Sequence, residues 1–501
     1  MTAPRPPTRA NTGPTRHVYD VAVVGGQLSG AIAATLLARR GYQVLYVEHD
    51  GTGSGYGHDG WLLPYAPFIL PPLKAVAAFE EVAAELGVTT PLQRAMKVAT
   101  PMLQLVRPGL RLDLFADPVR MASECKRALG EGGAGFIAAL GKATTAAERS
   151  EPFFREKPDL PPEGMFGRFK LNRMTGRHAA LTEGSTLSKE EPLEQLLNGL
   201  SGFLNYTEKS EGLAATRPLA LALGGLFTLP GGREGLREVF LNRLRELGGD
   251  VLLHDESTVA EALAFDGAKL TGIKLVRSET IYKTTVVLGA TDAGALRRLL
   301  PEKKRNRALS EALDGAQTRR ILFTVNWVLP ESALPRGMGE LLLCESDDAE
   351  LSPILVQVQP AKKVAESGGD ELRVVCAAAF IPATARELGE DHLKKLTDRL
   401  GKQLEGLMPF SRAKVVLESA PYLHAGGVRG SRMLPHPHLA FEDATLLGIT
   451  GLPVRAPAKH LFLASREVLP GLGFEGEVIT AQRVARMVQD TLKKNDPLKR
   501  R

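Results

Sequence analysis

The sequence has 501 residues, of which 44% are hydrophobic, and a formal net charge of +6. A chain of this length and composition can bury a large core and is long enough for about two to four domains. The charge lies in the tails, with three arginines in residues 1–17 and five basic residues against one acid in 493–501. The remaining chain is therefore close to neutral, which excludes the basic surface of a nucleic-acid-binding protein.

The ends of the chain predict tails and no membrane segment. Residues 1–17 are rich in proline, threonine and arginine and lack the apolar stretch of a secretory signal. The longest uncharged stretches are about 15 residues and fall short of a bilayer span. Three widely spaced cysteines predict reduced, buried thiols. We therefore expect a cytoplasmic protein, and weak contact of its basic tails with an anionic membrane surface stays open.

Residues 21–50 predict a strand, a glycine turn, a helix and a second strand that ends on an acid. Gly25, Gln27 and Gly30 stand at the three positions of the dinucleotide-binding pattern G-x-G-x-x-G. Glu48 follows at about the spacing at which an acid accepts hydrogen bonds from a ribose. The pattern indicates a nucleotide-binding βαβ unit, and a βαβ unit that binds nothing is the alternative.

The turn itself predicts an anion site. The backbone N–H groups that follow Gly26, at Leu28 and Ser29 in the first helical turn, are suited to a phosphate. Gln27 narrows this site, because the middle glycine of the pattern normally lets the backbone approach the pyrophosphate.

The next segments carry fewer signals. The apolar run 61–72 either lines a channel for a hydrophobic substrate or forms core, and core is favoured. Alternation over 103–114 predicts a hairpin, and 118–129 predicts a helix. The charged, proline-rich stretch 149–192 indicates a surface excursion, for which a lid over a site is one role.

The pattern then returns to alternating strands and helices. A helix after Gly231 is followed by strands near 251–253, 259–263 and 272–276 and by a buried strand that turns into a helix. A return to a parallel sheet this late in the chain indicates one domain built from discontinuous segments.

The last third predicts a second sheet. Strands between 320 and 418 follow one another with a single helix, 392–408, which indicates a largely antiparallel sheet. The chain ends on a strand, a glycine loop and a long helix over 460–493.

Three segments together resemble a known family. The opening βαβ unit, the run PGGREGLREVFLNRLRELGGDV with the later VVLGATDAGALRRLLP, and the terminal LFLASREVLPGLGFEGEVITAQRVARMV resemble the phytoene desaturase type of FAD-dependent oxidoreductase, in the amine oxidase superfamily. The resemblance covers residues 18–493 in order and spacing. It implies an α/β fold: a Rossmann-like FAD-binding domain built from discontinuous segments, and an α+β substrate domain with a mixed, largely antiparallel sheet.

The resemblance also implies boundaries and an activity. The FAD-binding domain would comprise residues 18–95, 216–300 and 446–493, the substrate domain 96–215 and 301–445, and the tails 1–17 and 494–501. A buried FAD would face an apolar tunnel and accept hydride from a hydrophobic, carotenoid-like or isoprenoid substrate. The implied cofactor-binding residues are Gly25, Gly26, Gln27, Leu28, Ser29, Gly30, Glu48, His49, Val259, Ser465, Arg466, Gly473 and Phe474.

Four departures from the family pattern lie around this cofactor. Gln27 replaces a glycine, Gly53-Ser54-Gly55 lacks the usual arginine, Ser465-Arg466 replaces Gly-Asp, and acids stand at 475 and 477. Arg466 would either pair with Glu475 and close the site or meet the pyrophosphate directly, and the sequence leaves both open.

The departures leave three functions. The first is an FAD-dependent oxidoreductase. The second is a non-catalytic protein that has lost FAD and binds a lipid or protein, in the way that the Rab escort proteins resemble this superfamily without using flavin. The third is a flavin-dependent isomerase. His49, His58 and Asp59 are candidates for a proton relay, although structural roles are favoured. His436 and His438 have no acid or cysteine set nearby, so a solvated loop is favoured over a metal site.

Overall fold

The computed structural model describes residues 15–49, 55–178, 181, 187–188, 190–253, 259–267, 269–276, 278–302, 307–363, 372–424, 436–441 and 446–493. The predicted tails, apart from residues 15–17, lie outside these residues, as do Gly53 and Ser54.

The first sheet has seven strands and carries the predicted βαβ unit. Its order is β10 (Ala260–Asp266), β11 (Lys269–Leu275), β12 (Ile281–Ala290), β1 (Val18–Gly25), β2 (Val44–Val47) and β9 (Asp250–Leu252), with β20 (Leu461–Leu463) beside β12. The pairs of β1 with β2 and β12, of β2 with β9 and of β12 with β20 are parallel. Strands from three distant parts of the chain thus form one sheet, which confirms the Rossmann-like α/β fold.

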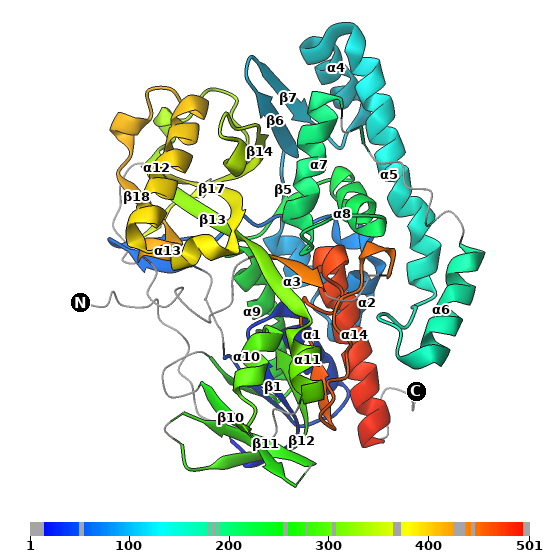
Figure 1. The fold of residues 1–501 in the computed structure, drawn as a ribbon. Helices are drawn as coiled ribbons and strands as arrows, with labels where there is room; N and C mark the ends of the chain where they lie inside the picture. The colour runs from blue at the N-terminus through cyan, green and yellow to red at the C-terminus, as the bar shows by residue number, and fades with distance from the viewer. Residues whose placement is uncertain are drawn as a thin grey trace.

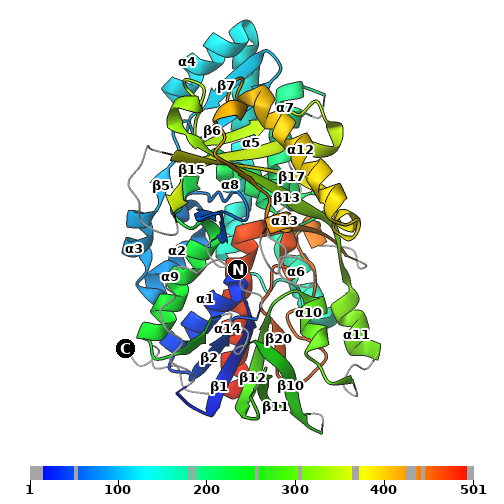
Figure 2. The same ribbon diagram turned by 90° about the vertical axis from the view of Figure 1, so that its left-hand side faces the viewer.

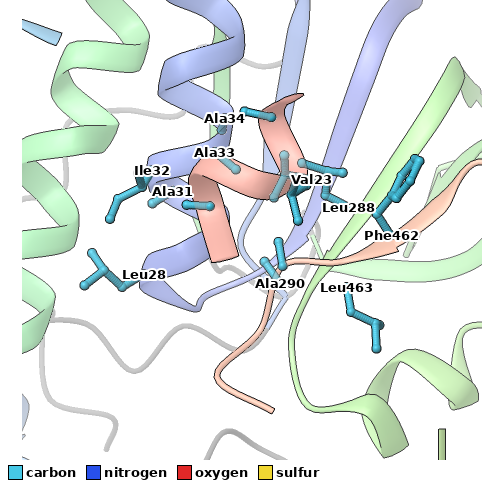
Figure 3. Packing of buried hydrophobic residues seen from close by; sticks show 14 of the residues in the cluster. Val23, Leu28, Ala31, Ile32, Ala33, Ala34, Leu288, Ala290, Phe462 and Leu463 are labelled. Carbon is cyan, nitrogen blue, oxygen red and sulfur yellow. The ribbon is translucent and has the colours of Figure 1, made fainter. Parts of the chain in front are cut away.

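Two glycines fix how α1 (Leu28–Arg39) leaves this sheet. Gly25 has φ of +135°, and a Cβ there would lie 2.0 Å from the carbonyl oxygen of Ala290. A Cβ on Gly30 would lie 2.1 Å from the Cβ of Ala290. Both positions therefore need glycine so that the helix can pack on the end of β12. Figure 3 shows the small side chains of α1 packed beside Ala290, Leu288 and the end of β20.

The second sheet has eight strands and one parallel pair. Its order is β18 (Leu417–Ser419), β13 (Ala316–Pro330), β17 (Leu372–Pro382), β15 (Ile354–Pro360), β14 (Leu341–Cys344), β6 (Leu103–Arg107) and β7 (Leu110–Leu114), with β19 (Pro437–Phe441) beside β13. Among the described residues of this sheet, β14 and β6 form the one parallel pair. The mixed, largely antiparallel sheet and the hairpin over 103–114 are confirmed, and the hairpin extends this sheet.

Short strands and the helices complete the fold. β3 (Tyr56–His58), β4 (Trp61–Leu63) and β16 (Lys362–Lys363) form one small sheet, and β5 (Lys97–Val98) pairs with β8 (Phe227–Thr228). The other helices are α2 (Ala77–Leu86), α3 (Thr89–Ala95), α4 (Pro118–Leu129), α5 (Gly133–Arg155), α6 (Gly164–Arg177), α7 (Pro192–Leu204), α8 (Leu213–Leu223), α9 (Gly232–Glu246), α10 (Ala293–Arg298), α11 (Arg307–Asp314), α12 (Glu390–Leu407), α13 (Pro421–His424) and α14 (Gly473–Leu492).

The stretch 149–192, predicted to be a surface excursion, contains regular helices in its first half. Residues up to 155 belong to the long helix α5, and α6 follows after a short connection. Phe153 and Phe154 of α5 and Leu171 of α6 are buried against the core of the first sheet. This apolar contact, made across a charged segment, gives the stretch its regular structure.

The two sheets lie at opposite ends of an elongated molecule, and α8 and the start of α14 lie between them (Figures 1 and 2). α1 packs between α9 and α14 on the first sheet. In the described part of the chain, no helix is long and apolar enough to cross a membrane. All three cysteines are free and buried, as predicted.

Candidate functional site

The predicted cofactor turn lies at the carboxyl end of the first sheet. Gly25 ends β1, Gly26 follows it, and Leu28, Ser29 and Gly30 begin α1. The backbone N–H of Gln27 donates to Ala290 at 3.0 Å, and Ser29 Oγ donates to the carbonyl of Ala464 at 2.5 Å. The turn is therefore tied to the ends of β12 and β20, at the edge of the sheet where ligands bind in open α/β folds.

The side chain of Gln27 fills the space in front of this turn. It is fully buried, its Nε2 donates to Asp292 Oδ1 at 3.0 Å, and its Oε1 accepts from the backbone N–H of Arg466 at 2.8 Å. One carboxamide thereby joins the ends of the three parallel strands β1, β12 and β20.

Arg466 completes the same cluster. Its Nη2 lies 3.1 Å from Asp292 Oδ1 and its guanidinium lies 5.7 Å from the ring of Tyr206. The side chain is inaccessible, and the neighbouring Ser465 is also buried. Pairing with Glu475 was one of the two alternatives for Arg466; in the structure Arg217 binds Glu475, and Arg466 contacts Asp292.

Glu48 binds an arginine. Arg237 of α9 contacts Glu48, lies 2.5 Å from Glu234 and donates to the carbonyl of Gly26 at 3.2 Å. Burial lowers the pKa of Arg237, but Glu234 and Glu48 outweigh it and hold the pKa well above its usual range. Glu48 thus directly follows β2, with a guanidinium beside it.

The remaining predicted positions lie farther out. His49 follows Glu48 and is partly buried, whereas Val259 precedes β10 and its carbonyl accepts from the backbone N–H of Val276 at 2.8 Å. Gly473 begins α14, and the ring of Phe474 meets that of Phe79 edge-on at 5.0 Å.

The two acids at the start of α14 each bind an arginine, of which Arg217 is buried and Arg233 is half-buried. Arg217 of α8 holds both carboxylate oxygens of Glu475 at 2.6 Å. Arg233 of α9 contacts Glu477, which also accepts from Tyr206 Oη at 2.7 Å. Burial by itself lowers the pKa of both guanidinium groups. The paired carboxylates have the larger effect, so the pKa of each arginine is raised.

A further acid lies beside Asp292. Glu467 is buried and its Oε2 accepts from the backbone N–H of Ala293 at 2.7 Å. Burial, and then repulsion from Asp292, raises the pKa of Glu467 to about 8. The cluster therefore holds a carboxyl group that keeps its proton at neutral pH.

An apolar cavity of about 160 Å³ lies between the two sheets. Its apolar lining comes from the run Leu62–Ile69 with Pro71 and from Phe203, Leu204, Leu221, Leu322, Leu355, Leu472 and Phe474. Arg233, Glu234, Gln357, Gln359, Tyr206 and His436 supply its polar groups. The run 61–72 was expected to be core, but most of it borders this cavity.

The two histidines of the predicted solvated loop are enclosed instead. His436 Nε2 donates to the carbonyl of Asn205 at 2.6 Å, and the ring of His438 stacks on Phe380 at 3.7 Å. Burial lowers the pKa of His436 well below its usual range and that of His438 to about 4. His58 instead stacks on His424 at 4.2 Å, outside the cofactor turn. Over the described ranges, no histidines, cysteines and acids gather into a metal site.

Sequence reasoning missed the buried cations. Arg217 stands alone in the apolar segment RPLALALGG, and Arg233 and Arg237 stand four residues apart on α9. A single arginine within an apolar helix is rarely buried unless it is paired, and this signal was available.

FAD does not fit the groove as these side chains occupy it. Its pyrophosphate would lie over the turn where Gln27 and Arg466 meet, and its ribose would bind Glu48, which Arg237 holds. Gln27, Arg466 and Arg237 are 0%, 1% and 4% exposed. The four arginines contact five acids, Glu48, Glu234, Asp292, Glu475 and Glu477, and Arg217 also contacts Glu151, so no surplus of positive charge faces a dianion.

Residues 23–86 match the family described as NAD(P)-binding Rossmann-like domain. Among solved structures, an oxidoreductase from Methanosarcina mazei is 13% identical, with a TM-score of 0.57 over 95% of this chain and 100% of that one. Cyclohexylamine oxidase from Brevibacterium oxydans is 14% identical, with a TM-score of 0.56 over 95% and 100%. Putrescine oxidase bound to putrescine is 14% identical, with a TM-score of 0.55 over 95% and 99%.

The chain has the fold of these oxidases. The likeness runs through both domains, since it covers nearly the whole of each chain, and at this identity it establishes the fold alone. No curated protein matches the sequence.

Proposed function

We propose that this protein binds a hydrophobic small molecule in the cavity between its two sheets. The cavity supports this, because its walls are predominantly aliphatic and aromatic with a few polar groups. Tyr206 contacts both Arg233 and His436 in this lining, and the three would orient a ligand by hydrogen bonds. A carotenoid-like or isoprenoid ligand is the narrower prediction from the resemblance.

An FAD-dependent oxidoreductase is the enzyme class that the fold favours. The whole-chain likeness to amine oxidases supports it, since their fold is shared from end to end. In this candidate the bound molecule would be a substrate for dehydrogenation, the electron acceptor would be FAD, and the pairs around Gln27, Arg237 and Arg466 would have to open.

A binding role without redox chemistry is the second candidate. It is favoured by one observation: Glu48, Glu475 and Glu477, which lie along the expected cofactor path, are each bound by an arginine of the same chain. The protein would then hold or transfer its hydrophobic ligand, as the fold does not dictate chemistry.

Ligand binding can be measured with an apolar fluorescent probe displaced by candidate hydrocarbons. Leu62→Trp fills the cavity and is expected to weaken probe binding about tenfold or more, which corresponds to about 1.4 kcal/mol. Leu388→Trp is the matched control, because Leu388 is exposed and away from the cavity. Equal binding by the two variants and the wild type would reject the cavity as the site. The visible absorbance of the purified protein separates the two candidates.

Peripheral membrane contact is part of this proposal, and α6 is its best support. Met165, Phe166 and Phe169 are exposed on this helix, and the basic Arg168 and Arg173 are exposed beside them. Apolar and basic side chains on one surface helix suit an anionic bilayer. Binding to phosphatidylserine vesicles should fall in Phe166→Ser/Phe169→Ser and persist in the control Phe410→Ser; no binding by the wild type would reject it.

A further inference from the structure

A Rossmann-like groove holds FAD by three kinds of interaction. The turn after the first strand offers N–H donors to a pyrophosphate, the acid after the second strand accepts from ribose hydroxyls, and the last helix directs its N-terminus at the flavin. In this chain the corresponding positions are the turn at Gln27, Glu48 and the start of α14.

The chain supplies its own partners at the pyrophosphate position. The carboxamide oxygen of Gln27 accepts the backbone N–H of Arg466, where a phosphate oxygen would accept. The amide nitrogen of Gln27 and the guanidinium of Arg466 both donate to Asp292 Oδ1. All three hydrogen bonds lie within 3.1 Å, so this part of the groove is closed by side chains.

The ribose position is filled in the same way. Arg237 forms an ion pair with Glu48, at the carboxylate to which two ribose hydroxyls would donate, and it also contacts Glu234 and the carbonyl of Gly26. An incoming nucleotide would have to displace a buried guanidinium from two carboxylates.

The start of α14 is filled as well. Arg217 neutralises Glu475 and is itself held by Ser150 at 2.7 Å and Glu151 at 2.9 Å. Arg233 neutralises Glu477 at the border of the cavity. Four arginines from two helices and one loop thus meet acids along the whole expected cofactor path.

We propose that these arginine–carboxylate pairs and Gln27 replace FAD as the filling of the groove, so that the protein folds without the cofactor and takes up none there. The inference goes beyond the proposed function, because a hydrophobic ligand can bind in the cavity whether or not the groove holds FAD.

The first test uses the wild-type protein. We expect it to be colourless when purified and to show the same melting temperature with and without a large excess of FAD, since a ligand that binds only the folded state raises that temperature. A flavin absorbance band at near one equivalent, or a clear rise in melting temperature, would overturn the inference.

The second test removes the filling. Gln27→Gly/Arg466→Ala clears the pyrophosphate position, and we expect FAD to raise the melting temperature of this variant alone. Arg483→Ala is the control, because Arg483 is a buried arginine of α14 on the side of Glu163. If the double variant folds, by circular dichroism, and takes up no FAD, Gln27 and Arg466 are not the blocking groups and the inference fails. Probe binding in the cavity, compared between Leu62→Trp and Leu388→Trp, tests the proposed function separately.

Discussion

Replacing Arg217 by methionine should lower the free energy of unfolding by about 3–5 kcal/mol, which is the range for removing one partner of a buried ion pair. Arg217 is inaccessible, donates twice to Glu475 at 2.6 Å and lies 4.0 Å from the ring of Phe154. Methionine keeps most of the apolar contact but leaves Glu475, which is 3% exposed, without its cation. The cost is therefore mainly that of one uncompensated buried carboxylate.

The double variant Arg217→Met/Glu475→Leu separates this cause from lost packing. Removing both charges should restore most of the stability, since replacing a buried pair by apolar residues is often neutral or stabilising by about 1–4 kcal/mol. Arg155→Met is the matched control, because the pair of Arg155 with Glu151 is exposed and should contribute at most about 1 kcal/mol.

Urea denaturation of the four proteins, followed by circular dichroism, measures these differences. If Arg217→Met loses no more stability than Arg155→Met, the buried pair does not stabilise the junction of α8 and α14. If the double variant is as unstable as the single one, packing rather than charge explains the loss.

Three further predictions follow from single positions. Between about pH 4.5 and 8 the folded state keeps a proton on Glu467 that the unfolded state releases, so the free energy of unfolding should fall by about 1.4 kcal/mol per pH unit as pH rises. Between pH 6.5 and 8 the urea midpoint should therefore depend less on pH in Glu467→Gln than in the wild type. Equal pH dependence in the two proteins would contradict this. Burial lowers the pKa of His438 to about 4, so the folded protein should lose stability relative to His438→Gln as pH falls from about 6.5 to 4, and parallel pH profiles would argue against it. Gly25→Ala should lower the free energy of unfolding by about 3 kcal/mol or more, because the new Cβ would meet the Ala290 backbone. Gly141→Ala, in open space within α5, should instead raise it by about 0.5–1 kcal/mol. Similar melting temperatures of the two variants would refute the reasoning.

Local pattern was sufficient for much of the fold. The turn at Gly25, the hairpin over 103–114 and the helices α4, α9 and α12 agree with the sequence because turn residues and hydrophobic periodicity act over a few positions. The order of these signals also indicated a domain assembled from separate segments, since a parallel strand needs a crossover to reach its neighbour.

The contents of the groove were not predictable in this way. The identity of Gln27, Arg466 and Glu475 showed that the cofactor positions are unusual, and the sequence alone determined this. The partners of these side chains were decided by the tertiary structure, because Arg217 and Glu475 are 258 residues apart in the sequence and Gln27 and Arg466 are 439 apart. Ion pairs in a low-dielectric interior depend on distances of a few ångströms, and no one-dimensional pattern contains those distances.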